Sequence, residues 1–299
     1  MKKTLLAVFS LLVILALAAC GENSDNNETS GAVPENEPKV LKIGAIPDQN
    51  ASELNRSFGA MAEYLSKETG LEVEYVPSVD YAALITAFER GEIQLGWFGG
   101  LTGVQVRNIV PEAEAIVQRP RDEQFHSVFI AQKDLAVDGL EDLKGLSFTF
   151  GSESSTSGHL MPRYYLNEAS INPEEDFDGS PSYSGSHDKT YKLVESGSYQ
   201  AGVLNEAVWE TAVAEGQVDL NKVKEFYITP AYYDYHWVVG NVDDVFGEGT
   251  KEKLKQALLS MDEEQKEILD LFATDKFIET KNENYAAIED VAKQLGIIK

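Results

Sequence analysis

Cysteine is nearly absent from this sequence, since Cys20 is the only one in 299 residues. A single thiol cannot form an internal disulfide. Basic residues are also scarce: 25 Lys and Arg stand against 50 Asp and Glu, for a formal net charge of −25. Nucleic acid is therefore an improbable partner, because it would require a basic surface. If the ligand is an anion, local donors must overcome this repulsive field.

Motifs of common enzymes and metal proteins are missing as well. A serine hydrolase would have to use Ser155, His187 and Asp188, but there is no G-x-S-x-G turn, and His187 and Asp188 are chain neighbours, which makes it awkward for the carboxylate to orient the imidazole. We therefore predict that the chain is not an enzyme. The histidines include no pair with the close spacing of a zinc motif, so we expect no metal and no cofactor; they are His126, His159, His187 and His236.

The N-terminus has the pattern of a lipoprotein signal. Lys2 and Lys3 precede an apolar run over 5–16 that is too short to span a bilayer comfortably, and small residues lead to Cys20. We expect residues 1–19 to be a signal peptide and the Cys20 thiol to be acylated, with palmitate for example. This would anchor the protein to the outer face of the cell membrane. A cysteine standing there by chance is the alternative.

Residues 20–39 consist mainly of Asn, Ser, Glu, Gly and Pro. A segment with so few bulky apolar residues cannot bury enough surface to order itself. We interpret it as a flexible linker that holds a folded part near the membrane. A flexible end without a purpose is the alternative.

Beyond residue 40, short apolar runs alternate with helical patterns, which is typical of an α/β protein with mostly parallel sheets. About 260 residues are enough for two lobes. The pattern restarts after residue 133 and ends in a helical segment over 251–295. We therefore predict one lobe from 40–133 plus 236–299 and a second lobe from 134–235.

The most informative loop lies between a predicted strand and a helix, in the segment Ser155, Thr156, Ser157 and Gly158. Ligands bind at the carboxyl ends of strands in α/β sheets, and a helix N-terminus offers unpaired N–H groups. Hydroxyls and N–H groups together would form a site for an anion. A serine-rich helix cap is the structural alternative.

A second loop carries His187 and Asp188 just before another predicted helix. The imidazole of His187 can donate to an oxyanion, although a structural role is equally compatible with the sequence. Asp188 can cap its helix or accept a proton from a ligand hydroxyl.

Aromatic residues are dense at several points, including Tyr81 at a helix start, the pair Trp97 and Phe98, and Tyr235. Tyr81 places a hydroxyl near the donors of a helix N-terminus. Adjacent aromatics such as Trp97 and Phe98 usually pack in a core, which is the alternative to a ligand contact.

Several strings together resemble the phosphate, phosphite and phosphonate solute-binding family of ABC transporters, and within it proteins labelled selenate-binding. These strings are GAIPDQN at 44–50, DYA at 80–82, WFGGLTGVQ at 97–105, FHSVFIA at 125–131, FTFGSESSTSGHLMP at 148–162, SGSHD at 184–188, LNEAVW at 204–209 and YYDYHW at 232–237. The resemblance implies a two-lobed type II periplasmic-binding-protein fold that closes on an oxyanion and delivers it to permease subunits. It also implies a receptor that acts as a monomer.

The resemblance further implies which residues contact the ligand: Tyr81, Ser155, Thr156, Ser157 and His187, with Asp188, Asn205 and Glu206 nearby. Phosphonate binders of this family typically carry a tyrosine where this chain has Phe98, so a hydroxyl contact is missing there. A buried Asp188 beside the anion would admit phosphite or hydrogen phosphate and repel sulfate or selenate. A membrane-anchored sensor with the same site is the functional alternative.

Overall fold

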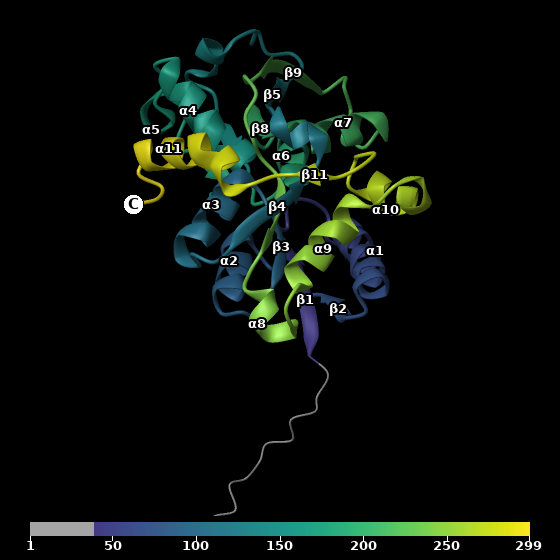
Figure 1. Ribbon diagram of the computed structural model, residues 1–299. Helices are drawn as coiled ribbons and strands as arrows, with labels where there is room; N and C mark the ends of the chain where they lie inside the picture. The colour runs from purple at the N-terminus through teal and green to yellow at the C-terminus, as the bar shows by residue number, and fades with distance from the viewer. Residues whose placement is uncertain (1–38) are drawn as a thin grey trace, which may run out of the picture. The chain divides into compact units, whose positions relative to one another are not determined.

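Two β-sheets with flanking helices organise residues 39–299, the part of the chain described by this computed structural model (Figure 1). The signal peptide, Cys20 and nearly all of the expected linker lie outside these residues. Within them, no helix is both long enough and apolar enough to cross a membrane.

The first sheet has the strand order β11-β4-β10-β3-β1-β2. Strands β1 to β4 run in one direction, whereas β10 and β11 run against them. The strands are β1 (Val40–Ala45), β2 (Glu72–Tyr75), β3 (Leu95–Phe98), β4 (Glu114–Gln118), β10 (His236–Val239) and β11 (Ile278–Glu279).

The second sheet has the order β7-β6-β8-β5-β9, and β5 runs against the other strands. Both sheets are therefore mixed: two of the five neighbouring strand pairs in the first sheet and two of the four in the second are parallel. The second sheet has a hydrophobic core on each face, because Val128 and Ile130 of β5 point to one side while Phe129 and Ala131 point to the other. The strands are β5 (Ser127–Gln132), β6 (Phe148–Phe150), β7 (Ser182–Tyr183), β8 (Ala201–Asn205) and β9 (Val223–Ile228).

The helices follow most strands directly, and the sequence explains their ends. In α1, the Asn50 side chain accepts from the Ser52 N–H at 2.8 Å, and Gly70 ends the helix with a φ of 73°. The α-helices are α1 (Ala51–Thr69), α2 (Tyr81–Glu89), α3 (Gly100–Ile109), α4 (Met161–Glu168), α5 (Pro173–Asp176), α6 (His187–Glu195), α7 (Glu206–Ala214), α8 (Val242–Phe246), α9 (Thr250–Leu259), α10 (Lys266–Leu271) and α11 (Ala286–Gln294).

Two details differ from the expectation. Strand β5 pairs with β8 and β9, so the chain enters the second sheet before residue 127 and not after residue 133. The C-terminal segment is not helical throughout, because β11 adds a strand to the edge of the first sheet. That strand was missed because it is short and lies between helical patterns. Helix α11 then packs beside α3 and α4 (Figure 1).

Two segments connect the sheets, namely 119–126 and 229–235. They are joined by reciprocal backbone hydrogen bonds between Phe125 and Tyr232, at 2.8 and 3.0 Å. The Asp234 N–H also donates to the carbonyl of Asp122 at 3.1 Å. The connection is thus a paired double strand, and its residues lead directly into the site described next.

Candidate functional site

Loops from both sheets meet where their strands end. The backbone N–H of His187, at the start of α6, donates to the carbonyl of Asp48 after β1 at 2.8 Å. The N–H of Leu101 in α3 donates to Oγ1 of Thr156 after β6 at 2.9 Å. The polar residues predicted from separate loops are therefore brought together in a buried region between the sheets.

The turn after β6 has the capping role that the sequence offered as the structural alternative. Ser155 Oγ accepts from the Gly158 N–H at 2.9 Å and caps a single π-turn, Thr156–Leu160. Such π-turns are rare and often occur at functional sites. A Cβ on Gly158 would lie 2.9 Å from Ser155 Oγ and 3.0 Å from the His187 ring, so the turn requires glycine here. The cap and the close approach hold Ser157 in place.

Two hydroxyls in this region are buried and make no hydrogen bond of good geometry among residues 39–299: Tyr81 Oη, which has Ser155 as a polar neighbour, and Ser157 Oγ, which has Asp234. Tyr81 is 2% exposed and Ser157 is 1% exposed. Burial, assisted by Asp48 and Asp234, raises the pKa of Tyr81 well above its ordinary value, so its hydroxyl keeps its proton. Buried polar groups in native proteins nearly always have partners, and each exception requires an explanation. Two such donors in one region indicate a binding site.

His187 is fully buried and neutral. Its Nδ1 accepts from the Asn205 N–H at 3.3 Å, and its Nε2 lies 3.4 Å from the Tyr235 hydroxyl. Burial lowers the pKa of His187 to about 3. Because Nδ1 is an acceptor, the proton of the neutral ring lies on Nε2. His187 can therefore donate without carrying a charge.

Asn205 and Tyr235 link the two sheets beside this histidine. Asn205 Oδ1 caps α7 by accepting from the Val208 N–H at 2.6 Å, and its Nδ2 donates to the Tyr235 hydroxyl at 2.8 Å. The Tyr235 ring stacks on Trp97 with centroids 5.8 Å apart. The Asn205 side chain thus fixes the position of Tyr235.

Two buried carboxylates, Asp48 and Asp234, were missed as site residues. Burial raises the pKa of Asp48 to about 6 and that of Asp234 to about 7. Asp234 Oδ1 accepts from the Gly100 N–H at 2.8 Å, whereas its Oδ2 makes no hydrogen bond of good geometry within the described chain, although the Thr156 and Ser157 hydroxyls lie near enough to the carboxylate to lower its pKa. Both residues stood in the strings that carried the family resemblance, but no local pattern distinguished them from helix caps or turn residues.

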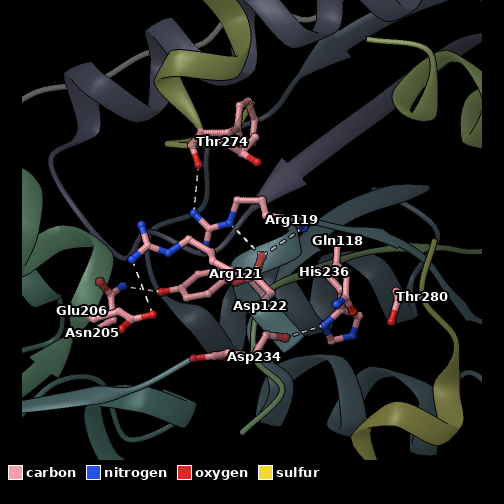
Figure 2. A network of polar contacts seen from close by, with 12 residues as sticks. Gln118, Arg119, Arg121, Asp122, Asn205, Glu206, Asp234, His236, Thr274 and Thr280 are labelled. Carbon is pink, nitrogen blue, oxygen red and sulfur yellow. Dashed lines mark hydrogen bonds and ion pairs between the residues drawn. The ribbon is translucent and has the colours of Figure 1, made fainter. Parts of the chain in front are cut away.

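The two acidic residues that were predicted near the ligand are occupied elsewhere. Asp188 accepts from Ser186 Oγ at 2.6 Å and pairs with Lys192 on its own helix at 3.5 Å. Glu206 lies 3.5 Å from the guanidinium of Arg121 in the connecting segment. Figure 2 shows this pair beside Asn205. Among the carboxylates, Asp48 and then Asp234 raise the pKa of the Tyr81 hydroxyl more than Asp188 does.

Trp97 and Phe98 point to opposite sides of β3. Trp97 borders a cavity of about 150 Å³ that also contacts Asp48, Asn205 and Tyr235. Phe98 lies in the core, with its ring over Gly96 and edge-on to Phe88 at 5.6 Å. The core alternative is therefore correct for Phe98. The absence of a tyrosine at this position changes the core and not the polar region.

Arg119 was also missed, although it lies against the same cavity. Its guanidinium forms two hydrogen bonds of 2.7 Å with Asp122 (Figure 2). A third bond of 3.0 Å joins it to the Phe272 carbonyl. It also lies over the rings of Trp97 and Tyr235, at 5.3 and 5.1 Å. A buried arginine with three fixed bonds thus braces the aromatic wall of this cavity, whose lining residues do not include Tyr81, Ser157, His187 or Asp234.

The arrangement lacks the features of a hydrolase. Within residues 39–299, Ser155 bonds to the turn, His187 to Asn205 and Tyr235, and Asp188 to Ser186 and Lys192, so they form no proton relay. The described residues also contain no group of three His, Cys, Asp or Glu side chains placed to hold a metal. The chemistry offered is a set of neutral donors and two carboxylates of raised pKa, which suits binding.

Comparisons with known proteins agree with this reading. Residues 43–285 match the family described as "ABC transporter, phosphonate, periplasmic substrate-binding protein". The chain is 43% identical over 272 residues to a probable ABC transporter phosphite binding protein, PhnD1, of Prochlorococcus marinus strain MIT 9301, covering 88% of this chain and 92% of the relative. It is 27% identical over 263 residues to the phosphate-import protein PhnD of Mycolicibacterium smegmatis, covering 84% of this chain and 79% of the relative.

A solved structure of the Prochlorococcus marinus PhnD1 in complex with methylphosphonate has the same fold. The TM-score is 0.85, and the match covers 88% of this chain and all of that one, at 100%. The predicted type II periplasmic-binding-protein fold is thereby confirmed, with mixed sheets. The family consists of transporter binding proteins and not of enzymes. The chain belongs to the phosphonate ABC-transporter periplasmic substrate-binding proteins, and it is an extracytoplasmic substrate-binding protein of this family.

Proposed function

We propose that this protein captures a small tetrahedral oxyanion between Tyr81 on one side and the turn Ser155–Ser157 with His187 on the other. The observation that carries the proposal is the pair of buried hydroxyls, Tyr81 Oη and Ser157 Oγ, that have no partner among the described residues. The Nε2–H of His187 adds a third donor. Each hydrogen bond to a charged ligand contributes about 1.5 to 3 kcal/mol.

Neutral donors suit this acidic chain. With a net charge of −25, the protein repels anions at long range, but salt screens this field within about 8 to 10 Å. The start of α2 adds the positive end of a helix dipole beside Tyr81. Inside a buried site these fixed dipoles act on the anion without competition from water.

Asp234 sets the protonation of the ligand in this proposal. Its Oδ2 is buried and can accept a proton that the ligand donates. An anion that keeps one hydroxyl, such as the methylphosphonate or phosphite monoanion or the hydrogen phosphate dianion, satisfies it. Above pH 7, where Asp234 is ionised, fully ionised sulfate or selenate would face an unpaired carboxylate. We therefore favour the phosphonate and phosphite class over selenate, in line with the ligands named for PhnD1.

We further propose that the two sheets belong to two lobes that move about the connecting segments 119–126 and 229–235. Asp234 and Tyr235 lie at the end of one connection, so a hinge motion there moves ligand-contacting groups directly. On this division the first lobe contains 40–118 and 236–299. The receptor acts as a monomer that presents both lobes to the permease subunits of an ABC importer.

Anchoring through an acylated Cys20 completes the proposal, because it keeps a receptor close to its permease. A Cys20→Ser variant tests this part independently of the ligand. We expect the wild-type protein to sediment with membranes and the variant to appear in the soluble or secreted fraction. Equal membrane association of both would contradict the anchor.

Isothermal titration with methylphosphonate, phosphite, phosphate, sulfate, selenate and selenite tests the ligand class. We expect micromolar or tighter binding of at least one protonated phosphorus oxyanion, and weaker binding of sulfate and selenate. If none of the six binds, the oxyanion proposal is wrong.

Two tyrosine variants test the site. Tyr81→Phe removes a hydroxyl without a partner in the described chain, so affinity should fall at least tenfold with little loss of stability. Tyr64→Phe removes a hydroxyl that donates to the Ala257 carbonyl at 2.7 Å, far from the site. It should lower stability by about 1 kcal/mol and leave affinity unchanged. The reverse pattern would place the ligand elsewhere.

A further inference from the structure

His236 lies fully buried at the start of β10, two residues after Asp234 (Figure 2). Its Nδ1 is 2.9 Å from the carbonyl oxygen of Asp234, and its Nε2 is 2.7 Å from Nη1 of Arg107. Both ring nitrogens therefore have partners. A rotation of the ring would break both contacts at once.

Arg107 determines which nitrogen of this ring carries the proton. A guanidinium only donates hydrogen bonds, so Nε2 must accept and Nδ1 must hold the hydrogen. Nδ1–H then donates to the Asp234 carbonyl. Burial and the nearby Arg107 lower the pKa of His236 well below its ordinary value, so the ring stays neutral. The contact to Asp234 is thus a directed hydrogen bond with a defined donor.

Helix α3 contacts the segment 234–236 at two points. A Cβ on Gly103 would lie 2.3 Å from His236 Nε2, so the ring packs where only glycine leaves room. At the N-terminus of the same helix, the Gly100 N–H donates to Asp234 Oδ1 at 2.8 Å. The helix therefore contacts Asp234 through its carboxylate and His236 through its ring. Together these contacts fix both ends of the 234–236 segment.

The C-terminal segment closes the other face of the imidazole. Tyr285 stacks on His236 with centroids 3.8 Å apart, and the Arg107 guanidinium lies 5.1 Å from the centre of the same tyrosine ring. The Tyr285 hydroxyl donates to Gln118 Oε1 at 2.9 Å. His236 is thereby held between α3 and the C-terminal segment, away from the ligand region itself.

We infer that His236 is a positioning residue for Asp234, which it aims by fixing the Asp234 carbonyl through Nδ1–H. Asp234 then has its backbone N–H on Asp122, its carbonyl on His236 and its Oδ1 on Gly100, and Oδ2 is left for the ligand. The inference rests on the proposed function, because it assumes that Asp234 accepts a proton from a bound oxyanion. His236 itself does not touch the ligand.

Two substitutions separate positioning from packing. In His236→Asn the amide nitrogen lies near the position of Nδ1 and can still donate to the Asp234 carbonyl. In His236→Gln the amide reaches toward Arg107 instead and the bond to Asp234 is lost. Both remove the ring stacked on Tyr285, so both should lower the melting temperature to a similar extent. Affinity for methylphosphonate and phosphite should fall about tenfold in His236→Gln, the equivalent of 1.4 kcal/mol, and at most about threefold in His236→Asn.

The controls make each outcome decisive. The wild-type protein is titrated first, and failure to bind there contradicts the proposed function and not the role of His236. His126→Gln removes an imidazole whose Nδ1 lies 2.6 Å from the Thr229 carbonyl, which is unconnected to Asp234, and should leave affinity unchanged. If the wild-type protein binds and the two His236 variants lose affinity equally, or not at all, the positioning role is wrong.

A second variant covers the case in which the His236 variants do not fold. Arg107→Met removes the guanidinium bound to Nε2, so the ring loses one of the two hydrogen bonds that fix its orientation, while the Asp234 carbonyl still favours the hydrogen on Nδ1. Affinity should fall about threefold, by roughly half of one hydrogen bond. Unchanged affinity in a folded Arg107→Met protein would overturn the inference.

Discussion

The backbone N–H of Asn205 donates to Nδ1 of His187 across 3.3 Å. A main-chain donor cannot change its role, so this bond fixes the imidazole hydrogen on Nε2. The same residue, Asn205, holds the Tyr235 hydroxyl at 2.8 Å through its side chain. The donor for the ligand and the aromatic wall beside it are therefore set by one residue at the end of β8.

Substitution of His187 tests this donor. His187→Gln can place an amide N–H near Nε2, whereas His187→Ala removes the donor. We expect His187→Ala to weaken oxyanion binding by about 1.5 to 3 kcal/mol and His187→Gln to recover part of the loss. Because the pKa of His187 is about 3, its contribution should not change between pH 5 and 8. Titration calorimetry at several pH values would expose a protonated histidine as a loss of affinity above pH 6.5.

The two serines of the π-turn should behave differently. Ser157→Ala removes a buried hydroxyl that has no partner within residues 39–299, so the free protein should be as stable as wild type or slightly more stable. Ser155→Ala removes the cap to the Gly158 N–H and should cost about 0.5 to 2 kcal/mol of stability. Both should lose ligand affinity. Urea unfolding alongside calorimetry checks the pair, and an equal loss of stability would contradict the assignment.

The stability of the ligand-free protein should depend on Asp234. Its pKa is raised to about 7 in the folded state, so the folded protein holds this proton to higher pH than the unfolded chain does. The corresponding stability is fully present below the ordinary aspartate pKa and is lost as the pH rises toward 7, at up to about 1.4 kcal/mol per pH unit. Urea unfolding from pH 4 to 8 should give a flatter profile for Asp234→Asn than for wild type. Identical profiles would show that Asp234 is ionised throughout.

Glycine substitutions test the contact between α3 and β10. Gly103→Ala puts a Cβ at 2.3 Å from His236 Nε2 and should destabilise the protein by about 1 to 3 kcal/mol. Gly59→Ala is the matched control, since a Cβ there meets nothing within 4 Å inside α1, and it should stabilise the helix by up to about 1 kcal/mol. Thermal unfolding of both variants checks the prediction. A neutral Gly103→Ala would mean that His236 packs elsewhere.

Local sequence patterns were sufficient to predict secondary structure and loop residues, because these depend on neighbours along the chain. Periodicity gave the main strands and helices, and strand-to-helix loops led to Tyr81, Ser157 and His187. The side-chain direction of Phe98 could not be predicted. Alternation along a strand indicates that Trp97 and Phe98 point to opposite sides, but not which of them faces the core.

Residues outside such loops escaped prediction for a physical reason. Asp234 stands in a connecting segment, and its place in the site depends on the pairing of 119–126 with 229–235. Arg119 lies in the other connection, where its bonds to Asp122 resemble an ordinary local cap. Only the three-dimensional arrangement shows that both meet the same buried region.

The bond from the Leu101 N–H to Thr156 Oγ1 joins α3, which follows the first sheet's β3, to the turn after β6 in the second sheet. In the proposed two-lobed receptor such a bond would favour the closed conformation even without ligand. A closed, ligand-free receptor would compete with ligand-bound receptors for the transporter. One neutral hydrogen bond contributes about 1 kcal/mol, whereas several charge-assisted bonds to an oxyanion contribute about 1.5 to 3 kcal/mol each. On the proposed two-lobe motion, this difference makes closure depend mainly on the bound ligand.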